Sequence, residues 1–85
     1  MSVVDSYIDV PVSNRFGCGC YTYKCVFDSS ETGIIKVEIF ADNVEQAISL
    51  IACNYWTISS WNYISNDIVA ITFSYGMSGT CLLYI

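Results

Sequence analysis

One stretch of this chain has the periodicity of a helix, and it lies between segments that alternate with the periodicity of strands. Its apolar residues recur at spacings of three and four and so share one face of a helix: Val44, Ala47, Ile48 and Ile51. Asp42 or Asn43 can cap the first turn, and Glu45 or Gln46 stands three residues further on, as a capping box requires. The pattern predicts a single helix that ends near residues 53–54.

Two strands precede this helix and form a predicted hairpin. In residues 20–27 two sets of side chains alternate between the faces of a strand. One face carries Tyr21, Tyr23, Cys25 and Phe27, and the other carries Thr22, Lys24 and Val26. Residues 35–41 alternate in the same way. The polar residues 28–33 between them end in a glycine and predict the connecting loop. We expect these strands to pair antiparallel, with the helix directly after them.

Strand-forming residues return after the helix. They predict strands at residues 56–65, 68–75 and 80–85, with tight turns at residues 66–67 and 76–79. Trp56, Ile58 and Ile64 alternate to the face opposite Trp61 and Tyr63. At the other end of the chain, residues 3–12 predict an edge strand or extended arm, because Pro11 cannot donate to a ladder, and residues 13–17 predict a turn.

The order of these elements defines the fold class. One helix cannot cover both faces of a parallel sheet, so the sheet should be mainly antiparallel. We predict one α+β domain over residues 1–85, with five or six strands in a β-β-β-α-β-β-β order and the helix packed on one face.

The charge balance limits the function. Three basic residues stand against eight acidic ones, which gives a net charge of -5, and there is no histidine. Three cations are too few for a typical duplex contact, so we expect no direct nucleic-acid binding. The lack of histidine removes the commonest general base, and no paired carboxylates or phosphate-binding loop stand out, so we expect no enzyme and no cofactor. The chain shows neither a secretory signal nor a membrane span, which favours a cytoplasmic protein with no membrane partner.

Five cysteines offer a further possibility. Cys18, Cys20 and Cys25 lie close together in the sequence, whereas Cys53 and Cys81 stand alone. The odd number favours reduced thiols. The first three could be free, bridged or bound to metal; the simplest interpretation is that they are small apolar residues with no metal.

Acidic and aromatic side chains remain as candidates for a protein-binding site. The acidic candidates flank the hairpin and the start of the helix, and they are Asp28, Glu31, Glu38, Asp42 and Glu45. The aromatic candidates are of the residue types that dominate interface hot spots, and they are Trp56, Trp61 and Tyr63. If the acids line one rim, they favour a partner with a basic surface. The alternatives are that the acids only maintain solubility and that the tyrosines only decorate a sheet.

The strand-then-helix run at residues 36–51, KVEIFADNVEQAISLI, resembles the centre of several small phage-encoded proteins, including anti-CRISPR proteins built from one helix on an antiparallel sheet. The resemblance implies an inhibitor that binds a CRISPR-type effector complex of the host and blocks its recognition of nucleic acid. It carries no binding residue across, because these families share no motif. Two alternatives stay open, which are a homo-oligomeric or virion-associated structural module with an aromatic sheet interface, and a small cysteine metal-binding or redox module.

Overall fold

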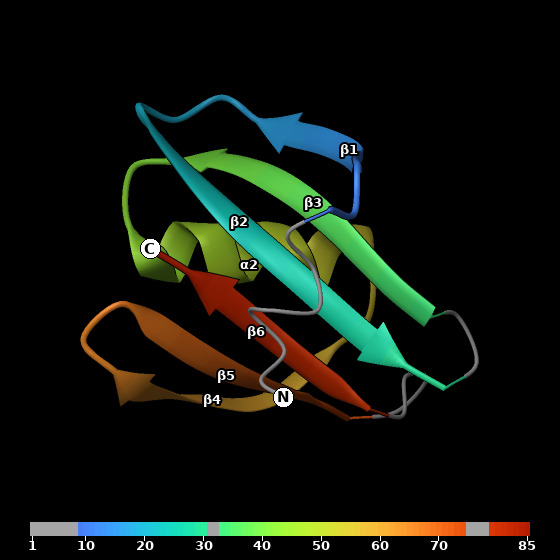
Figure 1. Ribbon diagram of the computed structural model, residues 1–85. Helices are drawn as coiled ribbons and strands as arrows, with labels where there is room; N and C mark the ends of the chain where they lie inside the picture. The colour runs from blue at the N-terminus through green and yellow to red at the C-terminus, as the bar shows by residue number, and fades with distance from the viewer. Residues whose placement is uncertain (1–8, 31–32, 75–78) are drawn as a thin grey trace.

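The computed structural model describes residues 9–30, 33–74 and 79–85, and in this part of the chain one helix packs against a six-stranded mixed sheet (Figure 1). The elements in chain order are β1 (Val12–Gly17), β2 (Tyr21–Ser29), β3 (Gly33–Ala41), α2 (Val44–Asn54), β4 (Ile58–Ser65), β5 (Ile68–Phe73) and β6 (Thr80–Tyr84). The order of strands across the sheet is β1-β3-β2-β6-β5-β4. The predicted α+β class, with a helix on a mainly antiparallel sheet, is confirmed.

The first strand differs from the prediction. The predicted turn at residues 13–17 is wrong, because these residues form β1, which pairs parallel with β3. The predicted strand at residues 3–12 overlaps β1 only at Val12, and residues 1–8 lie outside the described part of the chain. After β1 the chain crosses the end of β3 to reach β2. A Cβ on Gly19 would lie 2.2 Å from the Cα atom of Ala41, so this crossing needs a glycine.

The hairpin of β2 and β3 is confirmed and is longer than predicted. Its register pairs Asp28 with Ile34 and Ser29 with Gly33, so residues assigned to the loop belong to the strands. Residues 31–32 lie outside the described part of the chain.

The helix begins and ends where the sequence predicts. The Asn43 side chain accepts a hydrogen bond of 2.8 Å from the Gln46 backbone N–H, and the Gln46 side chain accepts one from the backbone N–H of Asp42. The two bonds satisfy the Gln46 amide, which the first turn leaves unpaired, and the Asp42 amide just before the helix. The predicted apolar stripe is confirmed, since Ala47, Ile48 and Ile51 are buried. No helix in the described residues is long and apolar enough to cross a bilayer.

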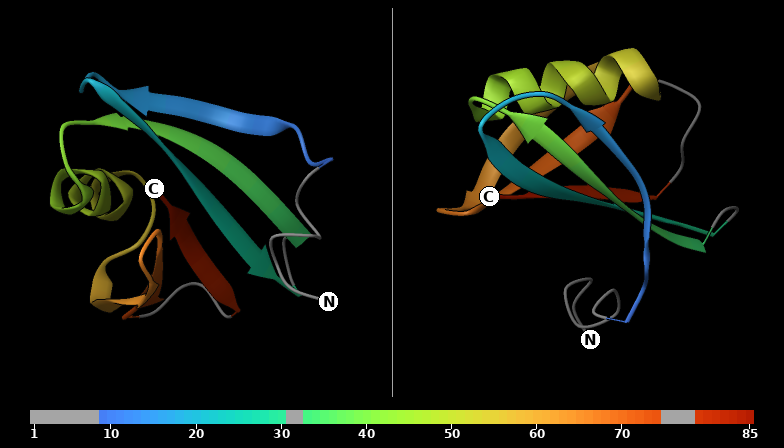
Figure 2. Two further views of the ribbon diagram at one scale, coloured as in Figure 1. Left: turned by 60° about the vertical axis from the view of Figure 1, so that its left-hand side comes forward. Right: turned by 90° about the horizontal axis from the view of Figure 1, so that it is seen from above.

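The sheet curves like an arc, with β1 and β3 at one end, β4 and β5 at the other, and α2 across its open side (Figure 2). The core lies between the helix and the inner face of the sheet. Its largest fully buried side chains are Phe27, Ile39, Ile51 and Leu83. Because alternate residues of a strand face opposite sides, this inner face carries the odd-numbered residues of β2 and β3.

An aromatic cluster joins the end of the helix to the sheet. The ring of Phe27 lies 4.9 Å from that of Tyr55 and 6.0 Å from those of Trp56 and Phe73, measured between centroids. Burial raises the pKa of the Tyr55 phenol, although a hydrogen bond with the Asn14 side chain partly opposes the shift. This cluster fixes the direction in which the chain leaves α2 and begins β4.

The three strands after the helix are present as predicted, but β4 differs in where it begins and in which side chains share a face. β4 begins at Ile58 rather than at Trp56, and residues 75–78, which include most of the second predicted turn, lie outside the described part of the chain. The prediction that Ile58 and Trp61 lie on opposite faces is wrong. The register of β4 with β5 shifts between Ile58 and Ser60, and this irregularity returns both side chains to the inner face.

Candidate functional site: the groove between the helix and strand β4

Two neighbouring hollows between α2 and β4 share Trp61 in their linings, and we call them together the helix–β4 groove. The acidic hollow, of about 610 Å³, is lined by Tyr23, Asp42, Asn43, Val44, Glu45, Trp61 and Tyr63. The uncharged hollow, of about 510 Å³, is lined by Ile48, Ser49, Ala52, Thr57, Ile58, Ser59, Ser60 and Trp61. Trp61 lines both hollows, so it stands at the middle of the groove.

The groove exists because the helix leans away from β4. α2 packs mainly against β3, and the Leu50 side chain reaches toward β1, where a Cβ on Gly17 would lie 3.0 Å from the Cδ1 atom of Leu50. β4 is the last strand at the opposite end of the arc. The helix therefore covers the inner face of β4 only in part.

Trp61 and Tyr63 form the aromatic wall of the groove. They pair with Ile71 and Val69 of β5, which are buried, so they share the inner face of the sheet. Nevertheless Trp61 is 36% exposed and Tyr63 is 50% exposed, and their ring centroids are 6.3 Å apart. Aromatic rings that face a core but are left uncovered are available to a ligand or partner.

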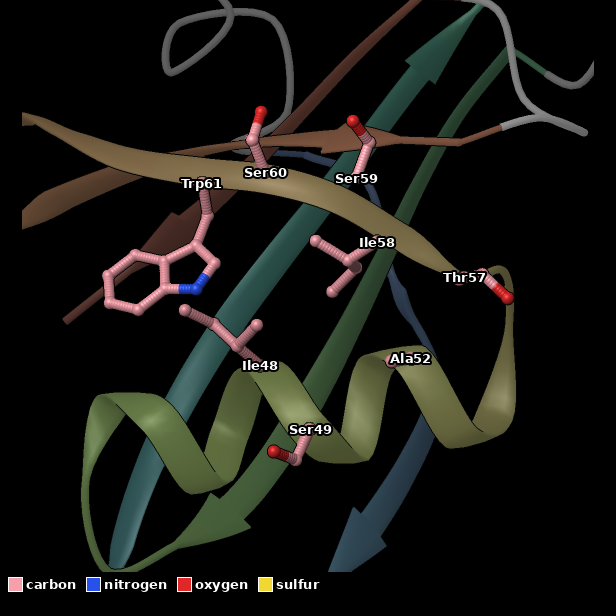
Figure 3. Close-up of a pocket in the computed structure, with 8 residues that line it drawn as sticks. All are labelled: Ile48, Ser49, Ala52, Thr57, Ile58, Ser59, Ser60 and Trp61. Carbon is pink, nitrogen blue, oxygen red and sulfur yellow. The ribbon is translucent and has the colours of Figure 1, made fainter.

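Figure 3 shows how the bulge in β4 shapes the uncharged hollow. The side chains of Ile58 and Trp61 point from β4 toward the helix, and Ile48 points back toward them from α2. The intervening Ser59 and Ser60 point away from the helix. Two consecutive outward residues are what a bulge produces, and the result is an apolar lining along the floor of this hollow.

One of the two carboxylates of the acidic hollow, that of Asp42, is held by a hydrogen bond to the backbone. The Asp42 side chain accepts a hydrogen bond of 3.0 Å from the backbone N–H of Cys20, in the loop that crosses the end of β3. The close approach of Gly19 to Ala41 brings that amide within reach. Glu45 lies exposed in the first turn of the helix. No lysine or arginine lines either hollow, so the described groove carries negative charge without a neighbouring cation.

The structure brings together four of the eight predicted site residues and places three of the others elsewhere. Asp42, Glu45, Trp61 and Tyr63 meet in the acidic hollow. Asp28 and Glu38 alternate with buried residues of β2 and β3 and so lie on the outer face of the sheet.

The remaining candidates lie away from the groove or outside the description. The carboxylate of Glu38 forms an ion pair of 2.7 Å with the Nε atom of Arg15. Trp56 packs in the aromatic cluster between the helix and the sheet, and Glu31 lies outside the described residues.

Sequence reasoning considered Asn43 only as a helix cap, and it did not predict Tyr23 or Val44 as lining residues of the acidic hollow. Their positions carry a signal in retrospect. Tyr23 shares the strand parity of the core residue Cys25, and Val44 is the first apolar residue after the helix cap, so both face the junction of hairpin and helix.

The cysteines do not gather at one place. Cys18, Cys20 and Cys53 are exposed, whereas Cys25 and Cys81 are buried with their Sγ atoms 3.5 Å apart. The prediction that Cys81 stands alone is therefore wrong. Burial, reinforced by the neighbouring Cys81 thiol, raises the pKa of the Cys25 thiol well above its usual range, so the Cys25 thiol is held protonated. Among the described residues no three histidine, cysteine or carboxylate side chains come close enough to share a metal ion.

Comparison of the chain with models of protein families, with curated proteins and with solved structures found no match. The chemistry of the groove therefore rests on its own residues. Carboxylates attract cations, and the faces of tryptophan and tyrosine attract the same groups through their π electrons. The acidic hollow combines both kinds of attraction.

Proposed function

We propose that this protein is a non-enzymatic inhibitor that binds a basic surface of a protein partner through the helix–β4 groove. The observation that carries the proposal is the meeting of two carboxylates and two exposed aromatic rings in one hollow that no basic residue lines. With a net charge of -5, the whole chain also favours approach to a positively charged surface.

The partner we propose is a nucleic-acid-handling complex of the CRISPR type. Basic surfaces of such complexes bind nucleic acid, and an acidic protein that occupies one would exclude the nucleic acid. Support for this choice is the resemblance of residues 36–51 to small phage-encoded inhibitors together with the acidic groove. On this proposal the protein is encoded by a phage or mobile element, suppresses antiviral defence and acts in the host cytoplasm.

The test measures whether the chain prevents purified CRISPR effector complexes from binding their target nucleic acid. The double variant Asp42→Asn/Glu45→Gln removes both charges of the acidic hollow, and asparagine keeps an oxygen that can accept the Cys20 amide. The matched control, Asp9→Asn/Asp67→Asn, makes the same change in net charge at two exposed positions outside the groove.

We expect the groove variant to bind at least about tenfold more weakly than the control, and wild-type association to slow as salt is added. Equal affinity of the two double variants would show that the groove is not the binding site. Binding by wild type that leaves nucleic-acid recognition intact would remove the inhibitory part of the proposal.

A second candidate is a homo-oligomeric structural module that associates through β4. It is favoured by the position of β4 at the end of the sheet, with Trp61, Tyr63 and Ile64 exposed. Light scattering over a range of low concentrations tests it. A dimer that persists on dilution and is lost in Trp61→Ala would support it, and a monomer throughout would refute it.

A further inference from the structure

The free edge of β4 runs along the helix–β4 groove. In the described residues β4 pairs only with β5, so its other edge has no strand partner. The curvature of the sheet directs this edge toward α2, as the left-hand view of Figure 2 shows. A further strand added to the arc would therefore lie in the groove between β4 and the helix.

The dimensions of the groove suit an extended segment. Its β4 wall runs over residues 57–63, which corresponds to about 20 Å at the rise of a strand. The two hollows lie one after the other along this wall, and Trp61 separates them. Successive side chains on one face of a bound strand would therefore meet first one hollow and then the other.

The charge of the groove indicates which segment it accepts. One end is uncharged and has Ile48, Ile58 and Trp61 in its lining, and the other end holds Asp42 and Glu45. A second copy of this chain, with its net charge of -5, would be repelled from this acidic end. A basic segment of another protein gains attraction there instead.

We propose that the helix–β4 groove binds an extended segment of the partner as a seventh strand on β4, with an apolar side chain in the uncharged hollow and an arginine or lysine in the acidic hollow. The proposal rests on the proposed function and adds to it the mode of recognition. Backbone hydrogen bonds along β4 supply affinity, and the two hollows select the side chains. The cationic group lies against Trp61 and Tyr63, within reach of the two carboxylates.

The test uses the full chain and a set of acetylated, amidated seven-residue peptides in which valine and arginine occupy every second position, so that both lie on one face of a strand, in different orders and with threonine between them. A second set carries N-methyl groups on alternate backbone nitrogens, which keeps the charge and side chains but blocks pairing along one edge. A third set replaces arginine with citrulline, which keeps the shape and removes the charge. Affinity is measured by calorimetry, and hydrogen exchange reports protection of β4 amides.

We expect the unmodified peptide that binds most tightly to protect amides of β4 from hydrogen exchange. Three changes should each weaken binding at least about tenfold: N-methylation on the paired edge of the peptide, citrulline in place of arginine, and the variant Asp42→Asn/Glu45→Gln. Methylated and unmethylated peptides that bind equally, but lose affinity in the groove variant, would overturn strand addition and leave the proposed function standing. Peptide binding that is indifferent to the groove variant would contradict both. The absence of peptide binding, or protection of β4 by a second copy of the chain, would overturn strand addition alone.

Discussion

The aromatic cluster around Phe27 holds the start of β4 in place, and removing this ring tests that arrangement. Phe27 is 2% exposed, and its ring contacts those of Tyr55, Trp56 and Phe73. Substitution of a buried phenylalanine by alanine costs about 3–5 kcal/mol. A domain of 85 residues has a total stability of about 4–13 kcal/mol, so Phe27→Ala removes a large part of it and can unfold the chain.

Phe27→Leu gives a measurable version of the same test. Leucine fills most of the space but loses the ring contacts, each of which contributes about 0.5–1.5 kcal/mol beyond buried area. We expect a loss of about 1.5 kcal/mol, which lowers the melting temperature by about 6–12 °C in a domain of this size.

The assay is urea unfolding followed by tryptophan fluorescence, because Trp56 lies against Phe27. The control is Tyr21→Leu, on the same strand and of the same parity, where the side chain is 63% exposed; we expect a change below about 0.5 kcal/mol. The reasoning is refuted if Phe27→Leu costs no more than Tyr21→Leu.

Three further predictions concern the loop, the helix cap and a buried thiol. Gly19→Ala should destabilise by about 3 kcal/mol in urea unfolding, because the new Cβ would meet the backbone of Ala41; an unchanged midpoint would show that the loop can move aside. Asn43→Ala should lower the free energy of unfolding by about 1 kcal/mol, because it loses the hydrogen bond from the Gln46 amide, whereas Asn43→Asp should be nearly neutral in thermal melts. An equal loss of stability in the two variants would contradict a capping role for Asn43. The pKa of the Cys25 thiol is higher in the folded state, so the stability that this shift contributes is complete below about pH 9.0 and is lost as the pH rises toward the folded-state pKa. The free energy of unfolding should therefore fall less steeply with rising alkaline pH in Cys25→Ala than in wild type. Equal slopes in the two proteins would contradict a raised pKa at Cys25.

The hairpin and the helix could be predicted because their signals are local. Alternation over nine-residue strands and the cap at Asn43 act within a few residues of where they are read. β1 could not, because Ser13, Asn14 and Gly17 are residues typical of turns. These residues are extended because they pair with the free edge of β3, and a pairing between segments more than 20 residues apart leaves no local pattern.

The candidate site was predicted in part for the same reason. Asp42 and Glu45 are adjacent to the helix cap, so their proximity follows from sequence alone. Their meeting with Trp61 and Tyr63 depends on how far the sheet curves, which no local pattern encodes. The separation of Glu38 could have been inferred, since its neighbours Val37 and Ile39 are core residues and a strand alternates.

The width of the helix explains why a groove must remain somewhere. Six strands spaced about 4.8 Å apart span about 24 Å, and a helix with its side chains is about 10–12 Å wide, so one helix covers about half of the inner face. Because α2 lies toward β3 and the inner-face residues of β5 and β6 are buried, the part left uncovered falls on β4.

Strands at the end of a sheet are commonly protected against unwanted pairing by lysine or proline, and β4 contains neither. Its sequence, ISSWNYIS, has no charge at all, so protection against self-association falls to the carboxylates of Asp42 and Glu45 across the groove. Carboxylates repel a second acidic copy and attract a basic segment, whereas a lysine on β4 would repel a basic segment. The same two residues can therefore keep the edge free and select its partner. The neutral variant Asp42→Asn/Glu45→Gln should then promote self-association and weaken binding of basic peptides together, and a change in only one of these properties would show that the two roles are separate.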